Sequence, residues 1–589
     1  MSGGVTVRHP RSMKIGVFHA KISRQLAGYG RAAGGSMRQM WAAWREHEFS
    51  AMLVILATDI FIATMDNLHV WAELLAGLDL SEVSHLGFAL IVLLTIMAVL
   101  LLLLLPALSH RLLKALLIFL LLLTALIGYF NTLGIAFDEL MLRSIMSSVT
   151  DRNVPEALEL VSPPLLLHML LLGVLPSYFV YATRLKPSGW LVSLLKRTGL
   201  MAICLALALG IVAVNYKHTI HLIGEHKALE RYVNPLYPIA GVVKTVRSTM
   251  NQRTVFEVLG EDARRVRSYP GKTVGILVVG ETARGDRFSL NGYERATNPR
   301  LAERSLISFT DAQACGTTTF FTIPCIFSFL PEKNFTPYKA EHQSNVLDVL
   351  DQAGVHVLWR DNNPNCKDVC ERVASENLAQ NHDPASPYYN NGEYLDEVLL
   401  ANLEEYIDAQ DGDVLIVLHQ MGSHGPAYFR RFPAASAAFT PYCQEKAQQL
   451  CDLAGLNNSY DNTIVYTDYF LDRAIALIER NNDKYASFLF YLSDHGESLG
   501  ENGVYLHGAP HMLAIREQFH IPMILWFSDS YRTGYQLDYM ALRGCRDHTV
   551  SQYQVAHTLM SLFGYDAEVY QPELDLLRLS CAPDSDHGG

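Results

Sequence analysis

The chain has 589 residues, half of them hydrophobic and 18% charged, and its formal net charge is −12 at pH 7. This length exceeds the size at which a single core usually stops growing, so more than one domain is expected. The acidic balance argues against nucleic-acid binding, which requires a basic surface.

Residues 49–216 are dominated by Leu, Ile, Val, Ala and Phe, and they predict a transmembrane domain that follows a basic tail over residues 1–48. A helix needs about 20 residues to cross a hydrocarbon core. We expect five such helices, at 49–73, 86–108, 115–136, 164–183 and 198–216. Lys and Arg gather in the tail and in two short loops, which predicts a cytoplasmic N-terminus. An odd number of spans then sends the C-terminal region to the outside.

Cysteine usage supports the same orientation. Eight of the nine cysteines follow residue 300, and most of them occur in close pairs: Cys315/Cys325, Cys366/Cys370 and Cys443/Cys451, with Cys545 and Cys581 left to pair by elimination. Even, closely spaced cysteines favour disulfides in an oxidising compartment. Zinc sites are the alternative, although no Cys-x-x-Cys repeat is present.

Residues 217–270 read as an amphipathic connector that lies on the membrane surface, or as a helical segment packed on the following domain. From residue 271 to 589, short apolar runs alternate with longer helical patterns. We expect strands at 273–279, 354–359, 413–418, 487–492 and 521–527, and helices at 343–353, 396–409, 460–480 and 552–563. This alternation predicts an α/β sandwich with a largely parallel sheet.

Polar side chains follow three of the predicted strands. Glu281 comes after the first, His419 and His424 come after the third, and Asp494 and His495 come after the fourth. In such sheets, ligands bind beyond the carboxyl ends of the strands, so these residues can converge. Each one alone also fits an ordinary turn or cap.

Carboxylate and imidazole groups are zinc ligands, and a catalytic zinc site leaves one position for the reacting group. Glu281, Asp494 and His495 supply three candidate ligands. Thr319 is the candidate fourth ligand and nucleophile, because it lies in a small-residue turn before an apolar segment. Metal coordination would activate its hydroxyl.

The motifs that carry these residues resemble those of the lipid A phosphoethanolamine transferases, which include the mobile colistin-resistance enzymes and have an alkaline phosphatase-like, sulfatase-like catalytic domain. The matching stretches are Val279-Gly-Glu-Thr-Ala-Arg284, Cys315-Gly-Thr-Thr-Thr319, Gly422-Ser-His-Gly-Pro426 and Ser493-Asp-His-Gly-Glu497. The resemblance covers nearly the whole chain after about residue 40.

The resemblance implies a zinc enzyme of the bacterial inner membrane with a periplasmic catalytic domain. Thr319 would attack phosphatidylethanolamine and then pass the phosphoethanolamine group to lipid A, which would give polymyxin resistance. By residue matching, Glu281, Thr319, Asp494 and His495 would bind zinc, and His424 and His507 would contact the transferred phosphate, a second zinc, or the leaving and attacking oxygens. Lys367 would contact substrate, and Glu497 would orient a ligand. We expect a monomer surrounded by membrane lipids.

Two alternatives remain open. The same chemistry on another periplasmic acceptor, such as core oligosaccharide or glucan, would use the same phosphorus-centred site. A membrane protein without catalytic activity that binds lipid headgroups would not need Thr319.

Overall fold

The computed structural model describes residues 47–581 with the exception of 78–82, 108, 138–140, 143–144, 146–159, 215–226, 251–254, 364, 379–382, 447 and 509–513. The predicted basic tail at residues 1–48 therefore lies almost entirely outside the described residues. The chain divides into two compact units. One comprises Met1–Met65, Leu86–Ala125 and Met169–Tyr216, and the other comprises Asp66–His85, Leu126–His168 and Lys217–Gly589.

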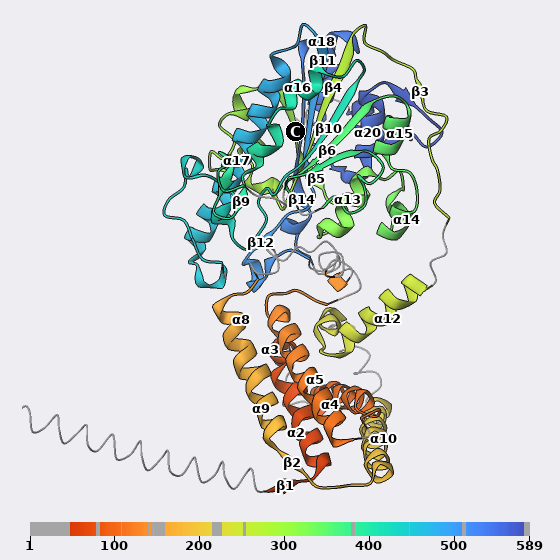
Figure 1. Cartoon of the computed structure of the whole chain (residues 1–589), viewed down its shortest axis with the longest axis vertical. Helices are drawn as coiled ribbons and strands as arrows, with labels where there is room; N and C mark the ends of the chain where they lie inside the picture. Colours follow the sequence, from red (N-terminus) through yellow and green to blue (C-terminus); the bar gives the residue numbers. More distant parts are fainter. Residues whose placement is uncertain are drawn as a thin grey trace, which may run out of the picture. The chain divides into compact units, whose positions relative to one another are not determined.

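Long apolar helices form the first part of the chain (Figure 1). Among the described residues, four spans are long and apolar enough to cross a membrane: His85–Leu103 within α4, His110–Asn131, Pro163–Ala182 and Trp190–Val214. The second and fourth of these are α5 and α10, and the third comprises α8 (Pro163–His168), a π-helical segment (Met169–Val174) and α9 (Leu175–Ala182).

The segment predicted as the first span is bent. Helix α2 (Ala51–Met65) and the part Leu68–Leu75 of α3 (Leu68–Gly77) meet at 58°, so together they count as one span only if the bent pair is a broken span. Asn67, at the bend, is buried and exchanges two hydrogen bonds of 2.8 Å with the backbone of Asn234. This pairing satisfies the Asn67 side chain where the helix is interrupted.

Helix α10 begins eight residues before the span predicted at 198–216. The sequence places Lys196 and Arg197 in a loop, but the structure places both in the helix. The Arg197 guanidinium is buried and donates hydrogen bonds to the carbonyls of Leu104 (2.7 Å) and Ala107 (2.9 Å). These carbonyls follow the end of a neighbouring helix, where backbone acceptors lack helical partners.

The second unit contains an eight-stranded sheet in its described part, ordered β15-β5-β14-β11-β4-β10-β6-β7. Its strands are β4 (Lys272–Gly280), β5 (Leu306–Gln313), β6 (His356–Asp361), β7 (Ala374–Asn377), β10 (Val414–His419), β11 (Tyr485–Ser493), β14 (His520–Phe527) and β15 (Val550–Ser551). Only β14 runs antiparallel to its neighbours. The expected α/β architecture with a largely parallel sheet is present.

Helices cover both faces of this sheet (Figure 1). On one face lie α13 (Thr319–Phe327), α15 (Val346–Gln352) and α20 (Val555–Leu562), and on the other lie α16 (Leu403–Asp408) and α17 (Leu453–Glu479). The smaller helices α14 (Pro337–Glu341), α18 (Asp529–Gly534) and α19 (Tyr539–Gly544) complete this part. Helix α12 (Leu236–Met250) lies in the predicted connector.

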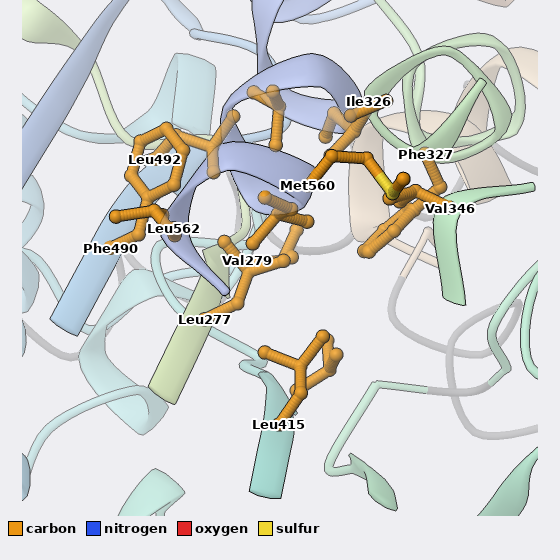
Figure 2. Close-up of a cluster of buried hydrophobic side chains, with 14 of the residues drawn as sticks. Leu277, Val279, Ile326, Phe327, Val346, Leu415, Phe490, Leu492, Met560 and Leu562 are labelled. Atoms are coloured by element: carbon orange, nitrogen blue, oxygen red, sulfur yellow. The ribbon is translucent and has the colours of Figure 1, made fainter. Parts of the chain in front are cut away.

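Buried apolar side chains alternate between the two faces, because successive residues of a strand point in opposite directions. Leu277 and Val279 of β4 pack with Ile326 and Met560 on one face (Figure 2). Ile276 and Val278 of the same strand pack on the other face, and this explains why the strand is a continuous apolar run.

Four disulfides join the eight cysteines that follow residue 300: Cys315–Cys325, Cys366–Cys370, Cys443–Cys451 and Cys545–Cys581. Cys204, the remaining cysteine, is buried in α10 with a free thiol. The expectation of disulfides rather than cysteine zinc sites is confirmed.

Candidate active site

The site is built at the carboxyl ends of two neighbouring parallel strands. Ser493 of β11 lies in register with Gly280 of β4, and the amide of Asp494 donates to the Gly280 carbonyl at 2.9 Å. Glu281 therefore follows one strand at the same level at which Asp494 and His495 follow the next. All three side chains are buried, and one ligand atom from each lies within 4.8 Å of the others.

Thr319 reaches this group from the other side of the chain's connectivity, as the first residue of α13. Its Oγ1 lies 3.2 Å from Glu281 Oε1, 3.3 Å from Glu281 Oε2 and 3.3 Å from His495 Nε2. The Cys315–Cys325 disulfide ties the preceding turn to α13. The amino end of the helix directs backbone N–H groups and a partial positive charge toward the space around Thr319.

Local hydrogen bonds orient the ligand atoms of His495. Its Nδ1 lies 2.8 Å from the Gly496 carbonyl, which selects the tautomer with the proton on Nδ1 and leaves Nε2 as a lone-pair donor. Nε2 lies 3.5 Å from Glu281 Oε1 and 3.3 Å from Asp494 Oδ2. Burial lowers the pKa of His495 to about 4, against the opposing effect of Asp494. A neutral imidazole is the form that binds metal ions.

Asp494 shows a feature that fits a metal ligand. Its Oδ1 accepts hydrogen bonds from the amides of Thr282 (3.0 Å) and His495 (2.7 Å). Its Oδ2 is buried and accepts no hydrogen bond from the described residues. A buried carboxylate oxygen without a donor is costly. Two carboxylates, an imidazole nitrogen and a hydroxyl form a donor set that suits zinc.

The two further predicted histidines lie beside His495. The ring centroid of His507 is 4.3 Å from that of His495 and 5.9 Å from that of His424. The His507 Nδ1 lies 3.3 Å from Oε1 of the fully buried Glu497. Glu497 therefore contacts His507 directly, and through this contact it fixes the direction of the imidazole.

The structure does not bring every candidate together. Lys367 lies in the Cys366–Cys370 loop with a backbone φ of 48°, and its side chain makes no recorded contact with the four clustered residues among the described part of the chain. His419 is the last residue of β10 and is fully buried, with Nδ1 3.0 Å from Asp361 Oδ1 and its ring against Trp359. It therefore belongs to the packing behind the site.

Two residues that the sequence analysis missed hold the cluster in place. The Asn363 amide donates to Glu281 Oε2 at 2.9 Å and to the Gln420 carbonyl at 3.2 Å. The buried Gln552 accepts from the Cys315 amide (2.7 Å) and donates to the carbonyls of Ser493 (2.9 Å) and Asp494 (2.6 Å). Asn363 follows a predicted strand and could have been found by this position. No sequence signal points to Gln552.

A third missed residue, Asp396, anchors the loop that carries His424. Its fully buried carboxylate accepts hydrogen bonds from the amides of Met421 (2.8 Å) and Gly422 (3.0 Å) and from the side chains of Asn362 (2.9 Å) and Gln420 (3.3 Å). Burial raises the pKa of Asp396, and these hydrogen bonds oppose the shift. The loop is therefore fixed by contacts to its backbone rather than by helix or sheet.

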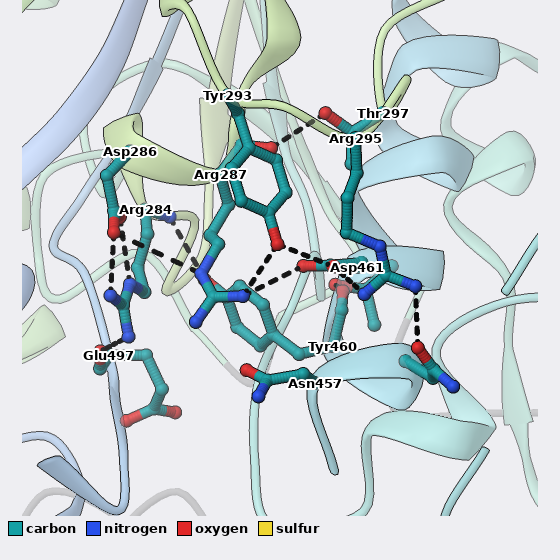
Figure 3. Close-up of polar contacts among 12 residues, drawn as sticks. Arg284, Asp286, Arg287, Tyr293, Arg295, Thr297, Asn457, Tyr460, Asp461 and Glu497 are labelled. Atoms are coloured by element: carbon teal, nitrogen blue, oxygen red, sulfur yellow. Dashed lines mark hydrogen bonds and ion pairs between the residues drawn. The ribbon is translucent and has the colours of Figure 1, made fainter. Parts of the chain in front are cut away.

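Charged contacts join the motif around Glu281 to the segment that follows His495 (Figure 3). The buried Arg284 donates to Asp286 at 2.7 Å, to Glu501 at 2.6 Å and to the Glu497 carbonyl at 3.2 Å. Tyr460 of α17 accepts from the Arg284 amide and donates to the Thr282 carbonyl. The strand-to-loop turn that carries Glu281 is thus held from both sides.

Comparisons with known proteins agree with this architecture. Residues 273–565 match the sulfatase family, and residues 96–250 match the family described as phosphoethanolamine transferase EptA/EptB. Phosphoethanolamine transferase EptA of Escherichia coli K12 is 39% identical over 469 residues, which cover 78% of this chain and 84% of that protein. Phosphatidylethanolamine transferase Mcr-1 of Escherichia coli is 33% identical over 567 residues, which cover 92% of this chain and 100% of that protein.

A solved structure matches over almost the same length. The integral membrane lipooligosaccharide phosphoethanolamine transferase A of Neisseria meningitidis aligns with a TM-score of 0.85 and 30% identity, covering 91% of this chain and 100% of that chain. The fold and the site therefore define an enzyme with a membrane domain and an alkaline phosphatase-like soluble domain. The chain belongs to the phosphoethanolamine transferase family.

Proposed function

We propose that this protein transfers phosphoethanolamine from phosphatidylethanolamine to a phosphate of lipid A through a covalent intermediate on Thr319. The observation that carries the proposal is the position of the Thr319 hydroxyl, which lies within 3.3 Å of both Glu281 and His495 at the amino end of α13. The printed names of the relatives, which include a lipooligosaccharide phosphoethanolamine transferase, support the donor group and the class of acceptor.

Zinc is the proposed resident ion, held by Glu281, Asp494, His495 and Thr319. The buried, unpaired Asp494 Oδ2 and the Nε2 lone pair of His495 support this donor set. Bound there, zinc would lower the pKa of the Thr319 hydroxyl and offset the charge of the reacting phosphate.

In the first half-reaction, the bond between Thr319 Oγ1 and phosphorus forms, and the bond between phosphorus and the glycerol oxygen breaks. The Thr319 proton leaves toward Glu281, whose carboxylate accepts the hydroxyl at 3.2 Å. His424 or His507 gives a proton to the departing glycerol oxygen. In the second half-reaction, an oxygen of a lipid A phosphate attacks phosphorus, and Thr319 Oγ1 regains a proton.

Two other side chains have supporting roles in this proposal. Glu497 orients His507, with which it makes a 3.3 Å contact. Lys367 contributes a positive charge to phosphate binding.

We place the protein in the inner membrane of a Gram-negative bacterium, with five spans that include the bent pair α2 and α3. The N-terminus is cytoplasmic, and the catalytic region is periplasmic. The four disulfides support an oxidising compartment for that region, and the basic loops support the orientation.

The direct test is intact-mass analysis and peptide mapping of the purified, zinc-loaded protein after incubation with phosphatidylethanolamine. We expect a phosphoethanolamine adduct on Thr319 that is absent from Thr319→Ala and that disappears when lipid A is added. Thr317→Ala is the matched control, because it removes a neighbouring threonine of the same turn and leaves the proposed nucleophile in place.

The other readings predict different outcomes. An adduct that persists with lipid A but is discharged by core oligosaccharide or glucan would replace the proposed acceptor. A folded, zinc-loaded protein that forms no adduct, and whose cellular effect survives in Thr319→Ala, would instead be a lipid-binding protein.

The cellular consequence follows from charge. Each added ethanolamine introduces a cation that reduces the attraction between lipid A and cationic peptides. Controlled expression is therefore expected to raise the polymyxin concentration that inhibits growth, and lipid A mass spectra should show the added group. Unmodified lipid A with unchanged susceptibility would contradict the proposal.

A further inference from the structure

A cavity of about 520 Å³ opens within the membrane unit and plays no part in the chemistry above. Its wall is formed by α2, α5, the π-helical segment, α9 and residues at their ends, and it includes Phe49, Leu53, Ala57, Leu121, Leu175 and Phe179. The wall is almost entirely apolar. One of its two threonines, Thr183, donates its hydroxyl proton to the Phe179 carbonyl and so offers little to a polar ligand.

The shape of the third long span contributes to this cavity. The π-helical segment Met169–Val174 interrupts the span directly before α9, and Pro176 follows at the start of α9. Proline lacks the N–H that an α-helix needs at its interior positions, and π turns change which side chains a helix presents to its neighbours. Leu171 of the π segment and Pro176 both line the cavity.

One end of the cavity is bordered by cations. Phe49 and Thr183, which line it, belong to or adjoin two short paired strands, β1 (Glu48–Phe49) and β2 (Arg184–Leu185). The side chains of Arg184 and Lys186 are exposed there, and the Lys186 amide donates to the Phe49 carbonyl at 2.9 Å.

A third cation lies at the same end. The Lys114 ammonium donates to the carbonyls of Tyr181 and Thr183. Glu48, paired in register with Arg184, is the acidic residue of these two strands. Positive charge therefore exceeds negative charge where the apolar cavity ends.

We propose that this cavity binds one acyl chain of an anionic phospholipid, whose phosphate is held by Arg184 and Lys186. The apolar wall suits a hydrocarbon chain, and the neighbouring cations suit a headgroup with a net negative charge. Under the membrane orientation proposed above, the lipid comes from the cytoplasmic leaflet. The site is independent of the transfer chemistry, because its lining and its charged border belong to the membrane unit.

The test is native mass spectrometry of the full-length protein in detergent, titrated with phosphatidylglycerol or with phosphatidylethanolamine that carries the same acyl chains. We expect one phosphatidylglycerol to be retained at least fivefold more tightly than phosphatidylethanolamine. Lys186→Gln and Arg184→Gln are each expected to reduce phosphatidylglycerol affinity about fivefold. Lys196→Gln, which removes an exposed cation of α10, is the matched control and should leave the affinity unchanged.

A second pair of variants tests the cavity itself. Ala57 is exposed on the cavity wall, so Ala57→Phe should fill the space without disturbing the helix core and should reduce retention of the lipid at least tenfold. Ala206→Phe makes the same change at an exposed position of α10 that does not line the cavity, and should leave retention unchanged.

The proposal is overturned if the two lipids bind equally, or if Ala57→Phe and Ala206→Phe behave alike. Thr319→Ala separates this inference from the proposed enzymatic function, because it should lose transfer and keep the bound phosphatidylglycerol.

Discussion

Asn363 is the side chain through which a third strand supports the cluster. It follows β6, and its amide donates to Glu281 Oε2 at 2.9 Å, so one oxygen of a proposed metal ligand is oriented by a neutral donor. Partners of this kind hold metal ligands in the productive direction.

Asn363→Ala is expected to lower the transfer rate about 10- to 100-fold and to weaken zinc binding, because Glu281 loses this donor. Asn363→Asp should be worse, since it places a second carboxylate against Glu281. The measurements are lipid A modification by mass spectrometry and zinc content of the purified protein. Asn334→Ala, at an exposed position, is the control, and equal activity of the Asn334 and Asn363 variants would contradict this role.

His557 of α20 gives a pH-dependent contribution to stability that is unrelated to the metal cluster. Its side chain is buried, and its Nδ1 accepts a hydrogen bond from the Gln571 amide at 3.1 Å. Burial lowers the pKa of His557 to about 4, although Glu573 opposes the shift. Below its ordinary pKa of 6.5 the unfolded chain binds a proton that the folded chain does not bind until about pH 4.

The free energy of unfolding should therefore fall as the pH is lowered from about 6.5 to about 4, and the part due to His557 amounts to at most about 3 kcal/mol. Above pH 6.5 this part is constant. His557→Asn keeps a short acceptor that does not titrate, so it should show a shallower decline in urea unfolding measured at several pH values. An unchanged slope would show that His557 remains solvated in the folded protein.

At the scale of elements, the site depends on the union of segments that are distant in sequence. Gln552 binds the turn before α13 through Cys315, and it binds the end of β11 through Ser493 and Asp494. One amide side chain thus sets the distance between the candidate nucleophile and one candidate ligand.

Gln552→Ala is expected to reduce transfer by more than tenfold and to cost about 1–3 kcal/mol of stability, because buried backbone groups lose their partner. Gln552→Glu should be at least as harmful, since a carboxylate would face two carbonyl oxygens. Gln554→Ala is the matched control: it removes a capping side chain of the same turn, which should lower stability while leaving transfer intact at permissive temperature. Circular dichroism and the lipid A assay separate the two effects. Parallel losses of activity in both variants would assign Gln552 a purely structural role.

The alternation of apolar runs predicted the central strands of the sheet well, because buried parallel strands need apolar side chains on both faces. Its limits appear at the irregular elements. The helix predicted at 396–409 is a 3₁₀ turn over Asp396–Leu400 followed by α16, with Asn402 at a φ of 54° between them. Strand β5, which carries polar residues at Thr310, Asp311 and Gln313, was not predicted. Its position between β14 and β15 depends on pairing with strands more than 200 residues away.

At the scale of the whole molecule, metal binding should couple activity to stability. A ligand that binds only the folded state at 100 times its Kd adds about 2.7 kcal/mol to the free energy of unfolding. Removal of zinc with a chelator is expected to lower the Tm of the catalytic region by several degrees and to abolish transfer, and added zinc should restore both.

Asp494→Ala should remove the effect of zinc on Tm, because it deletes a proposed ligand whose Oδ2 accepts no hydrogen bond from the described residues. Differential scanning calorimetry with and without zinc provides the measurement. A chelated protein with unchanged Tm and full activity would refute the zinc proposal.

The sequence by itself determined the features that depend on local composition. Apolar runs of sufficient length predicted the membrane helices, and short apolar runs that end in Glu281 or in Asp494 and His495 predicted where ligand atoms follow strands. Only the tertiary structure decided which distant side chains complete the arrangement. The bend at Asn67, the burial of Arg197 within α10, and the roles of Asn363, Gln552 and Asp396 all arise from contacts between segments far apart in the chain. A polar residue in a sequence does not reveal its partner, because the cost of burying it is offset only by a hydrogen bond that folding creates.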